Sequence, residues 1–379
     1  MIKKIYILFI VSILGSSVFG QFVGKDNLSV SLFYMQKSEL DSAKKYIDLS
    51  INDDDLKSSA KTWYYRGFIY KELYKSKEKD NKTSPFRLTS IEAFKKLLNL
   101  SDNAEFLESS NKILKYLAST LYNDAARLLD PENYKTSIAN YDEYRNIMLM
   151  LEPGTDFKPQ DIKFKLALAS MLNRPAETEA GLDSSQTNQI KKLYMDILSM
   201  DQNNPTANYN LGILYYNEAV DIINNMDYDM DIEKLNEVQD HCIEIFLQAL
   251  PYMKKADEMG YKAKETKLGL QNIYYGLNDM EKSDMYKNEL EYLENEEQYD
   301  MLNMKIKELE GKGMKDSEEC KQYTAQKQEI WNKFKERNSM LKTKIKELEE
   351  KNMKNSEEYK QYSTALQNLL NKFKDLEKE

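Results

Sequence analysis

The chain of 379 residues has little of what most catalytic and metal centres use: one histidine and two cysteines. The lone His241 excludes an HExxH motif and a multi-histidine site, and its neighbour Cys242 has no further ligands that would complete a zinc set. Neither a glycine-rich phosphate loop nor a G-x-S-x-G motif is present. We therefore predict no catalytic residues, no cofactor, no metal site and no enzymatic activity. Cys242 and Cys320 lie far apart, which favours two isolated buried thiols, with a disulfide as the alternative in an oxidising compartment.

One acidic stretch has part of a calcium-loop pattern. Asp227, Asp229 and Asp231 have the 1-3-5 spacing of such a loop. The loop also needs glycine at its sixth position and glutamate at its twelfth, and here these are Ile232 and Val238. We interpret the stretch as a solvated acidic insertion, with a calcium site as the weaker alternative.

Helix breakers are also scarce, with 7 prolines and 12 glycines in the whole chain. That scarcity, together with the lack of alternating strand patterns, predicts an all-α fold and argues against a sandwich or barrel. The net charge of -9 makes phosphate-rich partners unfavourable, so we expect no nucleic-acid partner. After the first twenty residues no apolar run is long enough to span a membrane, so we expect no integral membrane segment.

Residues 1–20 have the features of a secretory signal. A basic start, "MIKK", precedes the apolar run "IYILFIVSIL", and "GSSVFG" then places small residues at Val18 and Gly20. This predicts cleavage before Gln21 and export of a bacterial type, to the periplasm, the cell envelope or the medium. An uncleaved membrane anchor is the alternative.

Residues 21–295 repeat one amphipathic pattern, in which helical segments alternate with short polar breaks. The pattern predicts about five or six helical hairpins arranged as a short solenoid. Longer polar stretches at 75–87, 174–189 and 224–240 interrupt it. The first amphipathic segment, 31–51, carries Phe33, Tyr34, Leu40, Ala43, Tyr46, Ile47 and Ile51 at helical spacing.

A glycine stands inside the helical stretch "NPTANYNLGILYY", at Gly212. Glycine costs a helix about 1 kcal/mol relative to alanine. A residue without a side chain lets two antiparallel helices approach closely, which offsets that cost. We therefore expect Gly212 to lie where a neighbouring helix packs against its backbone.

Two stretches share this arrangement. They read Trp63-x2-Arg66-Gly67-x2-Tyr70 and Asn208-x2-Leu211-Gly212-x2-Tyr215. They resemble the first-helix pattern W-x2-L-G-x2-Y of the tetratricopeptide repeat family, with Arg66 in place of leucine and Asn208 in place of tryptophan. The family's second helix has a small residue nine positions after the tyrosine, and the pairs Tyr34/Ala43 and Tyr274/Ser283 have this spacing.

The resemblance implies a tetratricopeptide-like α-solenoid that acts as a protein–protein interaction scaffold of the cell envelope. It implies a protein or peptide partner held in the groove formed by the first helices. Asparagine and arginine can hydrogen-bond a peptide backbone or a carboxylate. Our candidate partner-binding residues are therefore Arg66, Asn208 and Asn210.

The segment 296–379 contains an internal duplication. "KIKELEGKGMKDSEECKQY" begins at Lys305 and "KIKELEEKNMKNSEEYKQY" at Lys344, 39 residues later. Each copy predicts a charged helix, a polar turn and a further helix, which Ser317 or Ser356 would cap.

Apolar residues in this segment follow the 3-4 alternation of a coiled coil. The sequence thus predicts an antiparallel coiled-coil or helical-hairpin arm. An alternative function is a structural spacer or self-association device that forms a homo-oligomer through this arm, with Asn338 setting the register. The three apolar seams comprise Tyr292, Asn295, Tyr299, Leu302, Ile306 and Leu309; Trp331, Phe334, Asn338, Leu341, Ile345 and Leu348; and Tyr359, Tyr362, Leu366, Leu369, Phe373 and Leu376.

Overall fold

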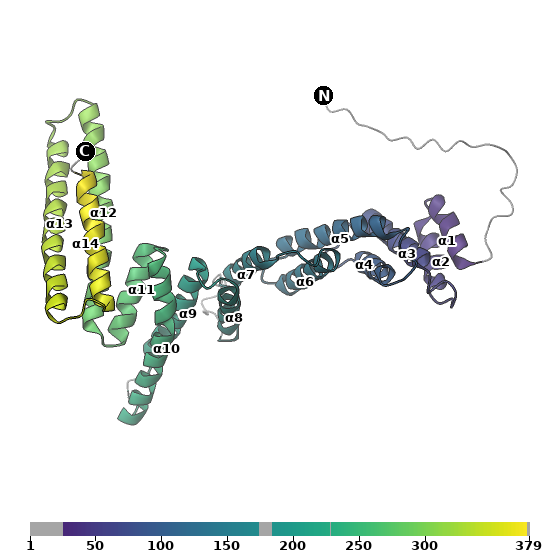
Figure 1. The fold of residues 1–379 in the computed structure, drawn as a ribbon, viewed down its shortest axis with the longest axis horizontal. Coiled ribbons are helices and arrows are strands. Elements are labelled where there is room, and N and C mark those ends of the chain that lie inside the picture. Colours follow the sequence, from purple (N-terminus) through teal and green to yellow (C-terminus); the bar gives the residue numbers. More distant parts are fainter. Residues whose placement is uncertain (1–25, 174–183, 228, 377–379) are drawn as a thin grey trace. The chain divides into compact units, whose positions relative to one another are not determined.

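The structure is a computed structural model that describes residues 26–173, 184–227 and 229–376. Every regular element in these ranges is helical, so the predicted all-α fold is confirmed (Figure 1). The predicted signal, 1–20, lies outside the described residues, as does the 174–183 part of the predicted polar loop.

The chain forms two compact units, residues 1–174 and 175–379. In the first unit, consecutive helices pair as the hairpins α1/α2, α3/α4 and α5/α6, and α7 follows them. The bounds are α1 (Asn27–Gln36), α2 (Leu40–Ser50), α3 (Ala60–Leu73), the π-helical turn η1 (Tyr74–Glu78), α4 (Pro85–Leu98), α5 (Leu107–Arg127), α6 (Tyr134–Leu151) and α7 (Lys158–Leu172).

In the second unit, α8 packs against α9, and two further hairpins, α9/α10 and α11/α12, lead into the arm. The arm consists of α12, α13 and α14, so α12 belongs both to the last hairpin and to the arm. The predicted boundary between residues 295 and 296 falls inside α12. The bounds are α8 (Ser184–Met200), α9 (Pro205–Asn224), α10 (Ile232–Glu258), α11 (Ala263–Gly276), α12 (Met280–Gly311), α13 (Glu318–Glu350) and α14 (Glu357–Leu376).

The helix ends follow from local sequence. Asn204 accepts a hydrogen bond from the amide of Ala207 at 3.0 Å, and proline takes the next position, where its missing N–H costs nothing. Ser84 caps α4 in the same way. The segment 31–51, which the sequence presents as one amphipathic run, is divided into α1 and α2 at Ser38, whose φ is 60°.

The glycines on the repeat helices lie at close crossings. A Cβ atom on Gly212 would be 2.6 Å from Cγ of Met253 and 3.2 Å from the backbone nitrogen of that residue on α10. A Cβ on Gly67 would be 2.7 Å from the ring of Phe94 on α4. The expected reason for Gly212 is therefore confirmed, and it applies to Gly67 as well.

A side-chain-to-backbone bond crosses each of the five repeat hairpins of the described residues, and no sequence pattern predicts it. A small hydroxyl or thiol on one helix donates to a carbonyl oxygen of the other, so the polar group is satisfied where the helices touch. The bonds run from Ser31 Oγ to Ala43 O (2.7 Å), Ser90 Oγ to Gly67 O (2.7 Å), Ser137 Oγ to Ala125 O (2.7 Å), Cys242 Sγ to Ala219 O (3.8 Å) and Ser283 Oγ to Gln271 O (3.0 Å).

The arm packs along its predicted seams. Each seam residue whose side chain is described is buried or half-buried, and Leu341 and Leu369 are only 1% and 0% exposed. Side chains also join α14 to α12, because Lys372 pairs with Asp300 at 2.9 Å. Ser317 accepts from the amide of Cys320 at 3.2 Å and Ser356 from that of Tyr359 at 3.1 Å. The predicted helical-hairpin arm and both predicted caps are confirmed.

Candidate binding surfaces

The predicted binding residue Arg66 ties α3 to α2. Its Nε donates to Oδ1 of Asp48 at 3.1 Å, and its guanidinium lies 4.9 Å from the ring centre of Tyr70. The hydroxyl of Tyr70 donates to the other oxygen of Asp48 at 2.7 Å. These contacts give Arg66 a structural role, and a role in partner binding stays a prediction.

The two predicted asparagines lie at the start of α9, in the second unit. Asn208 is 3% exposed, and its Nδ2 donates to the carbonyl oxygens of Gln202 at 3.0 Å and Asn204 at 2.9 Å. Asn210 is half-buried and donates to the carbonyl of Thr206 at 2.9 Å. Both side chains stabilise the entry to the helix, and their binding role also stays a prediction.

A second carboxylate holds a tyrosine and an arginine in the same way as Asp48. Asp161 of α7 accepts from the hydroxyl of Tyr141 at 2.8 Å and from Nε of Arg145 at 3.2 Å, and both donors lie on α6. Burial, followed by the bond to Asp161, raises the pKa of Tyr141 far above its usual value. The neutral ring of Tyr141 is thus fixed between α6 and α7.

Beside this ring, the first unit has a cavity of about 190 Å³ between α5, α6 and α7, which we call the aromatic hollow. Tyr141 and Phe164 form one side of it, stacked with centroids 4.1 Å apart and planes 4° from parallel. Tyr122 of α5 also lines the cavity and is 38% exposed. Gln160 and Lys163 of α7 are exposed and add the polar groups. No short sequence motif marks this site, because its residues come from three helices.

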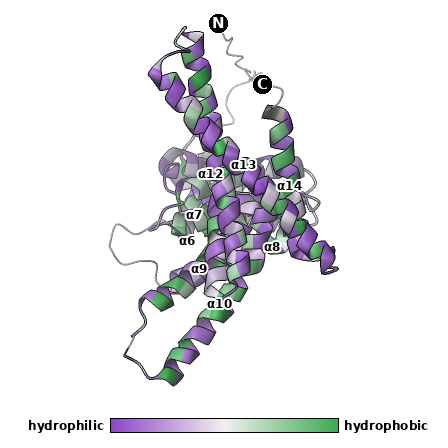
Figure 2. Cartoon of the chain, turned by 90° about the vertical axis from the view of Figure 1, so that its left-hand side faces the viewer, coloured by the Kyte–Doolittle hydropathy of each residue, from purple (hydrophilic) through white to green (hydrophobic). Residues whose placement is uncertain are grey.

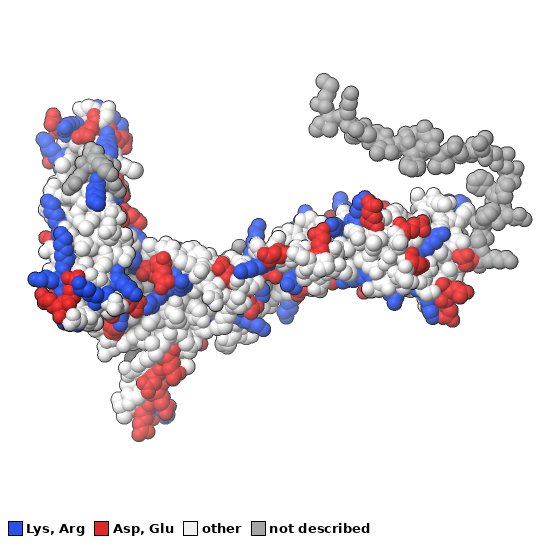
Figure 3. Space-filling model, in the orientation of Figure 1, with Lys and Arg blue, Asp and Glu red and all other residues white. Residues whose placement is uncertain are grey.

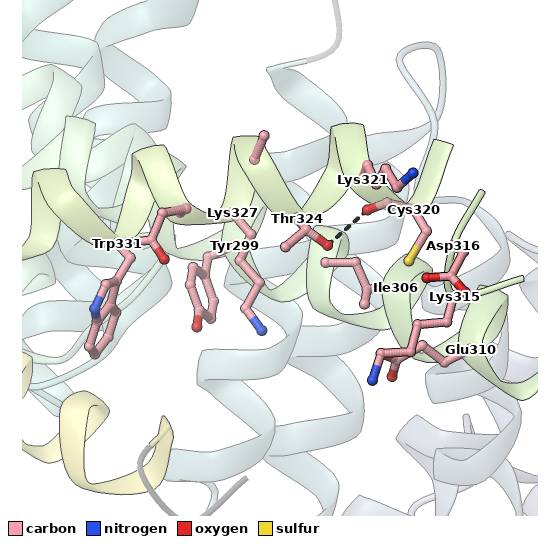
Figure 4. A pocket seen from close by; sticks show the side chains of 12 residues that line it. Tyr299, Ile306, Glu310, Lys315, Asp316, Cys320, Lys321, Thr324, Lys327 and Trp331 are labelled. Carbon is pink, nitrogen blue, oxygen red and sulfur yellow. Dashed lines mark hydrogen bonds and ion pairs between the residues drawn. The ribbon is translucent and has the colours of Figure 1, made fainter. Parts of the chain in front are cut away.

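A larger cavity of about 840 Å³ lies between α12 and α13, and we call it the distal hollow. Figure 4 shows Asp316, Lys315 and Glu310 together at one end, and Tyr299 and Trp331 at the other. Ile306 lies between the two ends, and Cys320 lies beside Asp316. The hydroxyl of Thr324 donates to the carbonyl of Cys320 at 2.8 Å.

The acidic stretch that resembled a calcium loop joins α9 to α10, and acidic side chains gather there (Figure 3). Hydrophilic and hydrophobic residues alternate along both helices (Figure 2). Asp231 caps α10 by accepting from the amide of Lys234 at 2.9 Å. Within the described ranges no group of three or more His, Cys, Asp or Glu residues could hold a metal ion.

The lone histidine and the two cysteines differ in exposure. His241 is exposed and its Nδ1 lies 4.0 Å from Glu244. Cys242 and Cys320 are both buried and free, which confirms the prediction of isolated thiols. None of the described helices combines the length and the apolar character needed to cross a membrane.

Comparison with known proteins gives little further guidance. No protein-family model matches the chain, and no curated protein matches it. Among solved structures, a monomeric mutant of IFIT1 with Gppp-AAAA is 14% identical, with 89% of this chain and 80% of that chain covered and a TM-score of 0.26. A second monomeric IFIT1 mutant, with m7Gppp-AAAA, is 13% identical with the same coverage and TM-score. With similarity this weak, the fold and the binding surfaces rest on this chain's own contacts.

Proposed function

We propose that the protein is a non-enzymatic, tetratricopeptide-like scaffold that binds a protein or peptide segment through the aromatic hollow. The observation that carries the proposal is a cavity lined by two aromatic side chains that solvent reaches, the exposed Tyr122 and the half-buried Phe164. These residues lie on α5 and α7. In the repeat pattern these are successive first helices, and the family resemblance implies a binding groove formed by first helices. From the signal-like N-terminus we propose that this binding takes place in the cell envelope after export.

The lining of the aromatic hollow favours a particular ligand chemistry. The cavity of about 190 Å³ suits one apolar side chain, which would pack against rings that are already held in place. Lys163 offers a cation for a carboxylate, and Gln160 can donate to and accept from a peptide backbone. The preferred ligand is therefore an extended peptide with an apolar anchor next to an acidic residue.

A displayed library of random peptides, selected on the purified protein, tests this proposal. We expect selected peptides to share the apolar anchor and the acidic neighbour. Phe164→Ala and Tyr122→Ala should each weaken binding by about tenfold or more, as truncation of a central aromatic contact does. Lys163→Glu should shift the preference toward basic peptides.

A matched control is Tyr116→Ala, which removes a tyrosine of α5 that is 41% exposed and lies outside the hollow. It should leave peptide binding unchanged. If no peptide family is enriched, or if the control and the hollow variants weaken binding equally, the assignment of the aromatic hollow is wrong.

The alternative function is a structural spacer or self-association protein that acts through a C-terminal coiled coil. The distal hollow favours it, because this cavity lies between α12 and α13 in the duplicated part of the arm and has an apolar floor that includes Ile306 and Trp331.

A further inference from the structure

The duplicated halves of the arm form two hairpins with the same turn. In the first hairpin, α12/α13, the amide of Met314 donates to Leu309 O at 2.9 Å, and Gly313 has a φ of 73°. In the second, α13/α14, the amide of Met353 donates to Leu348 O at 2.8 Å, and Asn352 has a φ of 58°. The two copies therefore have closely similar backbone turns at the same offset of 39 residues.

A third helix covers the second hairpin. The first half of α12 packs on it, where Gln361 donates to the hydroxyl of Tyr286 at 3.3 Å and Arg337 pairs with Glu289. As a result Tyr362 is only 9% exposed, and the gap left between the three helices is about 200 Å³.

The first hairpin has no such cover over its distal part in the described structure. The ring of Phe373 in α14 packs against Trp331 at 4.9 Å, and α14 is described no further than Leu376. The distal hollow of about 840 Å³ is lined by α12 and α13. Among the described residues, the duplicated hairpin thus has one copy with a helix on its seam and one copy whose distal seam no described helix covers.

The lining of the distal hollow differs from its duplicate in ways that keep it open. Cys320 stands where the second copy has Tyr359, which fills the equivalent space and donates to Glu349 at 3.0 Å. Lys327 stands where the second copy has the apolar Leu366. The short side chain of Cys320 leaves space that a tyrosine would occupy. Lys327 adds a positive charge where the second copy has an apolar side chain.

Asp316 at one end of the hollow and Lys327 toward the other carry opposite charges. Asp316 lies at the turn, where its neighbour Lys315 pairs with Glu310 at 4.0 Å, and Lys321 is exposed. The Nζ of Lys327 donates to the neutral Oδ1 of Asn303 at 2.5 Å and lies over the ring of Tyr299 at 5.0 Å, with no carboxylate beside it. Eleven residues separate the two charges along the chain, or roughly 16 Å at the helical rise.

We propose that the distal hairpin binds the distal hairpin of a second copy of this chain, antiparallel, to form a four-helix bundle. A twofold axis across the hollow brings Asp316 of each copy to Lys327 of the other, whereas a parallel arrangement places like charges together. The second copy then covers the apolar floor, as α12 does in the duplicated hairpin. The contact is at the small end of specific interfaces, so we expect a micromolar dimer.

Sedimentation equilibrium of the purified protein, over roughly 5 to 300 µM, measures the dimer directly. We expect the mass to rise from one chain toward two. Asp316→Lys and Lys327→Glu should each raise the dimer Kd by about tenfold, because each change breaks two symmetric pairs. The double variant rebuilds both pairs with reversed sign and should return Kd to within about threefold of the original.

Two further variants keep the test specific. Asn355→Lys changes the equivalent turn of the covered hairpin and should leave Kd unchanged. Cys320→Tyr introduces the residue of the second copy, fills the hollow from within and should abolish the dimer while helicity by circular dichroism is retained.

A monomeric mass at every concentration would overturn the proposal and leave the hollow to a different occupant, such as a helix of another protein. A double variant no tighter than the single variants would also overturn it, as would equal effects of Asn355→Lys and Asp316→Lys. The peptide test of the aromatic hollow uses residues of the first unit, so the two proposals fail independently.

Discussion

The repeat hairpin α3/α4 and the arm hairpin α13/α14 both join two antiparallel helices, but they bring the helices together by different means. In α3/α4 the backbone of Gly67 touches the ring of Phe94, and Ser90 donates to the carbonyl of Gly67. In the arm, large side chains such as Leu341 and Leu369 fill the space between helices. The repeat hairpin is therefore sensitive to added atoms, and the arm to removed atoms or added charge.

The largest expected effect comes from a charge in the arm seam. Leu341→Asp should destabilise the arm by at least about 3 kcal/mol, because it removes a buried side chain and buries a carboxylate without a partner. Leu369→Asp should act similarly. Urea unfolding followed by circular dichroism, with limited proteolysis to locate the loss, measures the effect.

The neighbouring Lys342→Asp, at an exposed position of the same helix, is the matched control and should change the unfolding free energy little. If both leucine variants unfold like the original protein, the seam does not hold the arm together.

The seam was predictable because the 3-4 spacing of large apolar residues is visible in the chain itself. Gly212 was predictable for a related reason, since a glycine inside a helix needs a compensating contact. The hydroxyl bonds of Ser31 and Ser137 were not predictable, because serine is equally at home on a helix surface and only the facing helix decides its role. The partner of each is a backbone carbonyl, which leaves no mark in the sequence.

The candidate binding residues also divide into features that the sequence predicts and features that depend on a facing helix. The sequence predicts Arg66 and Asn208 as binding residues because they are polar and lie on first helices, whereas the structure bonds them to Asp48 and to the turn before α9. Those bonds depend on the placement of other segments, which spacing alone does not give. The aromatic hollow is not predictable from the sequence, because Tyr122, Tyr141 and Phe164 come from three helices and each alone has the pattern of a core residue.

The next prediction contrasts a glycine of each region. Gly67→Ala should cost about 1 to 3 kcal/mol, since its Cβ would lie 2.7 Å from a fully buried ring that has little room to move. Gly311→Ala, at the end of α12, meets nothing within 4 Å and should stabilise the protein by about 0.4 to 1 kcal/mol. Chemical denaturation of both variants checks the opposite signs. Equal signs would mean that the repeat region and the arm do not differ in packing at these two glycines.

A smaller effect should follow the loss of one crossing bond. Ser90→Ala removes the 2.7 Å bond to the carbonyl of Gly67 and should cost about 1 kcal/mol. Ser76→Ala removes a comparable 2.8 Å bond to the carbonyl of Glu72, but at an exposed position where water replaces it. The unfolding free energy of the Ser76→Ala variant should stay within about 0.5 kcal/mol of that of the original protein. If Ser76→Ala lowers the unfolding free energy as much as Ser90→Ala does, the bond that crosses the hairpin contributes no more than a bond on the surface.

The smallest effect at neutral pH concerns a buried tyrosine of the repeat region. Burial raises the pKa of Tyr194 to about 12, above the value near 10 of an exposed tyrosine. Below pH 10 the side chain is neutral in the folded and unfolded states and adds no pH dependence. Between pH 10 and 12 the unfolded state loses this proton while the folded state keeps it, so stability falls as pH rises.

Tyr194→Phe should therefore reduce the fall in melting temperature between pH 10 and 12. Tyr275→Phe, at a position 66% exposed, should leave that fall unchanged. Identical alkaline profiles for the two variants would show that Tyr194 ionises as freely in the folded protein as in the unfolded chain.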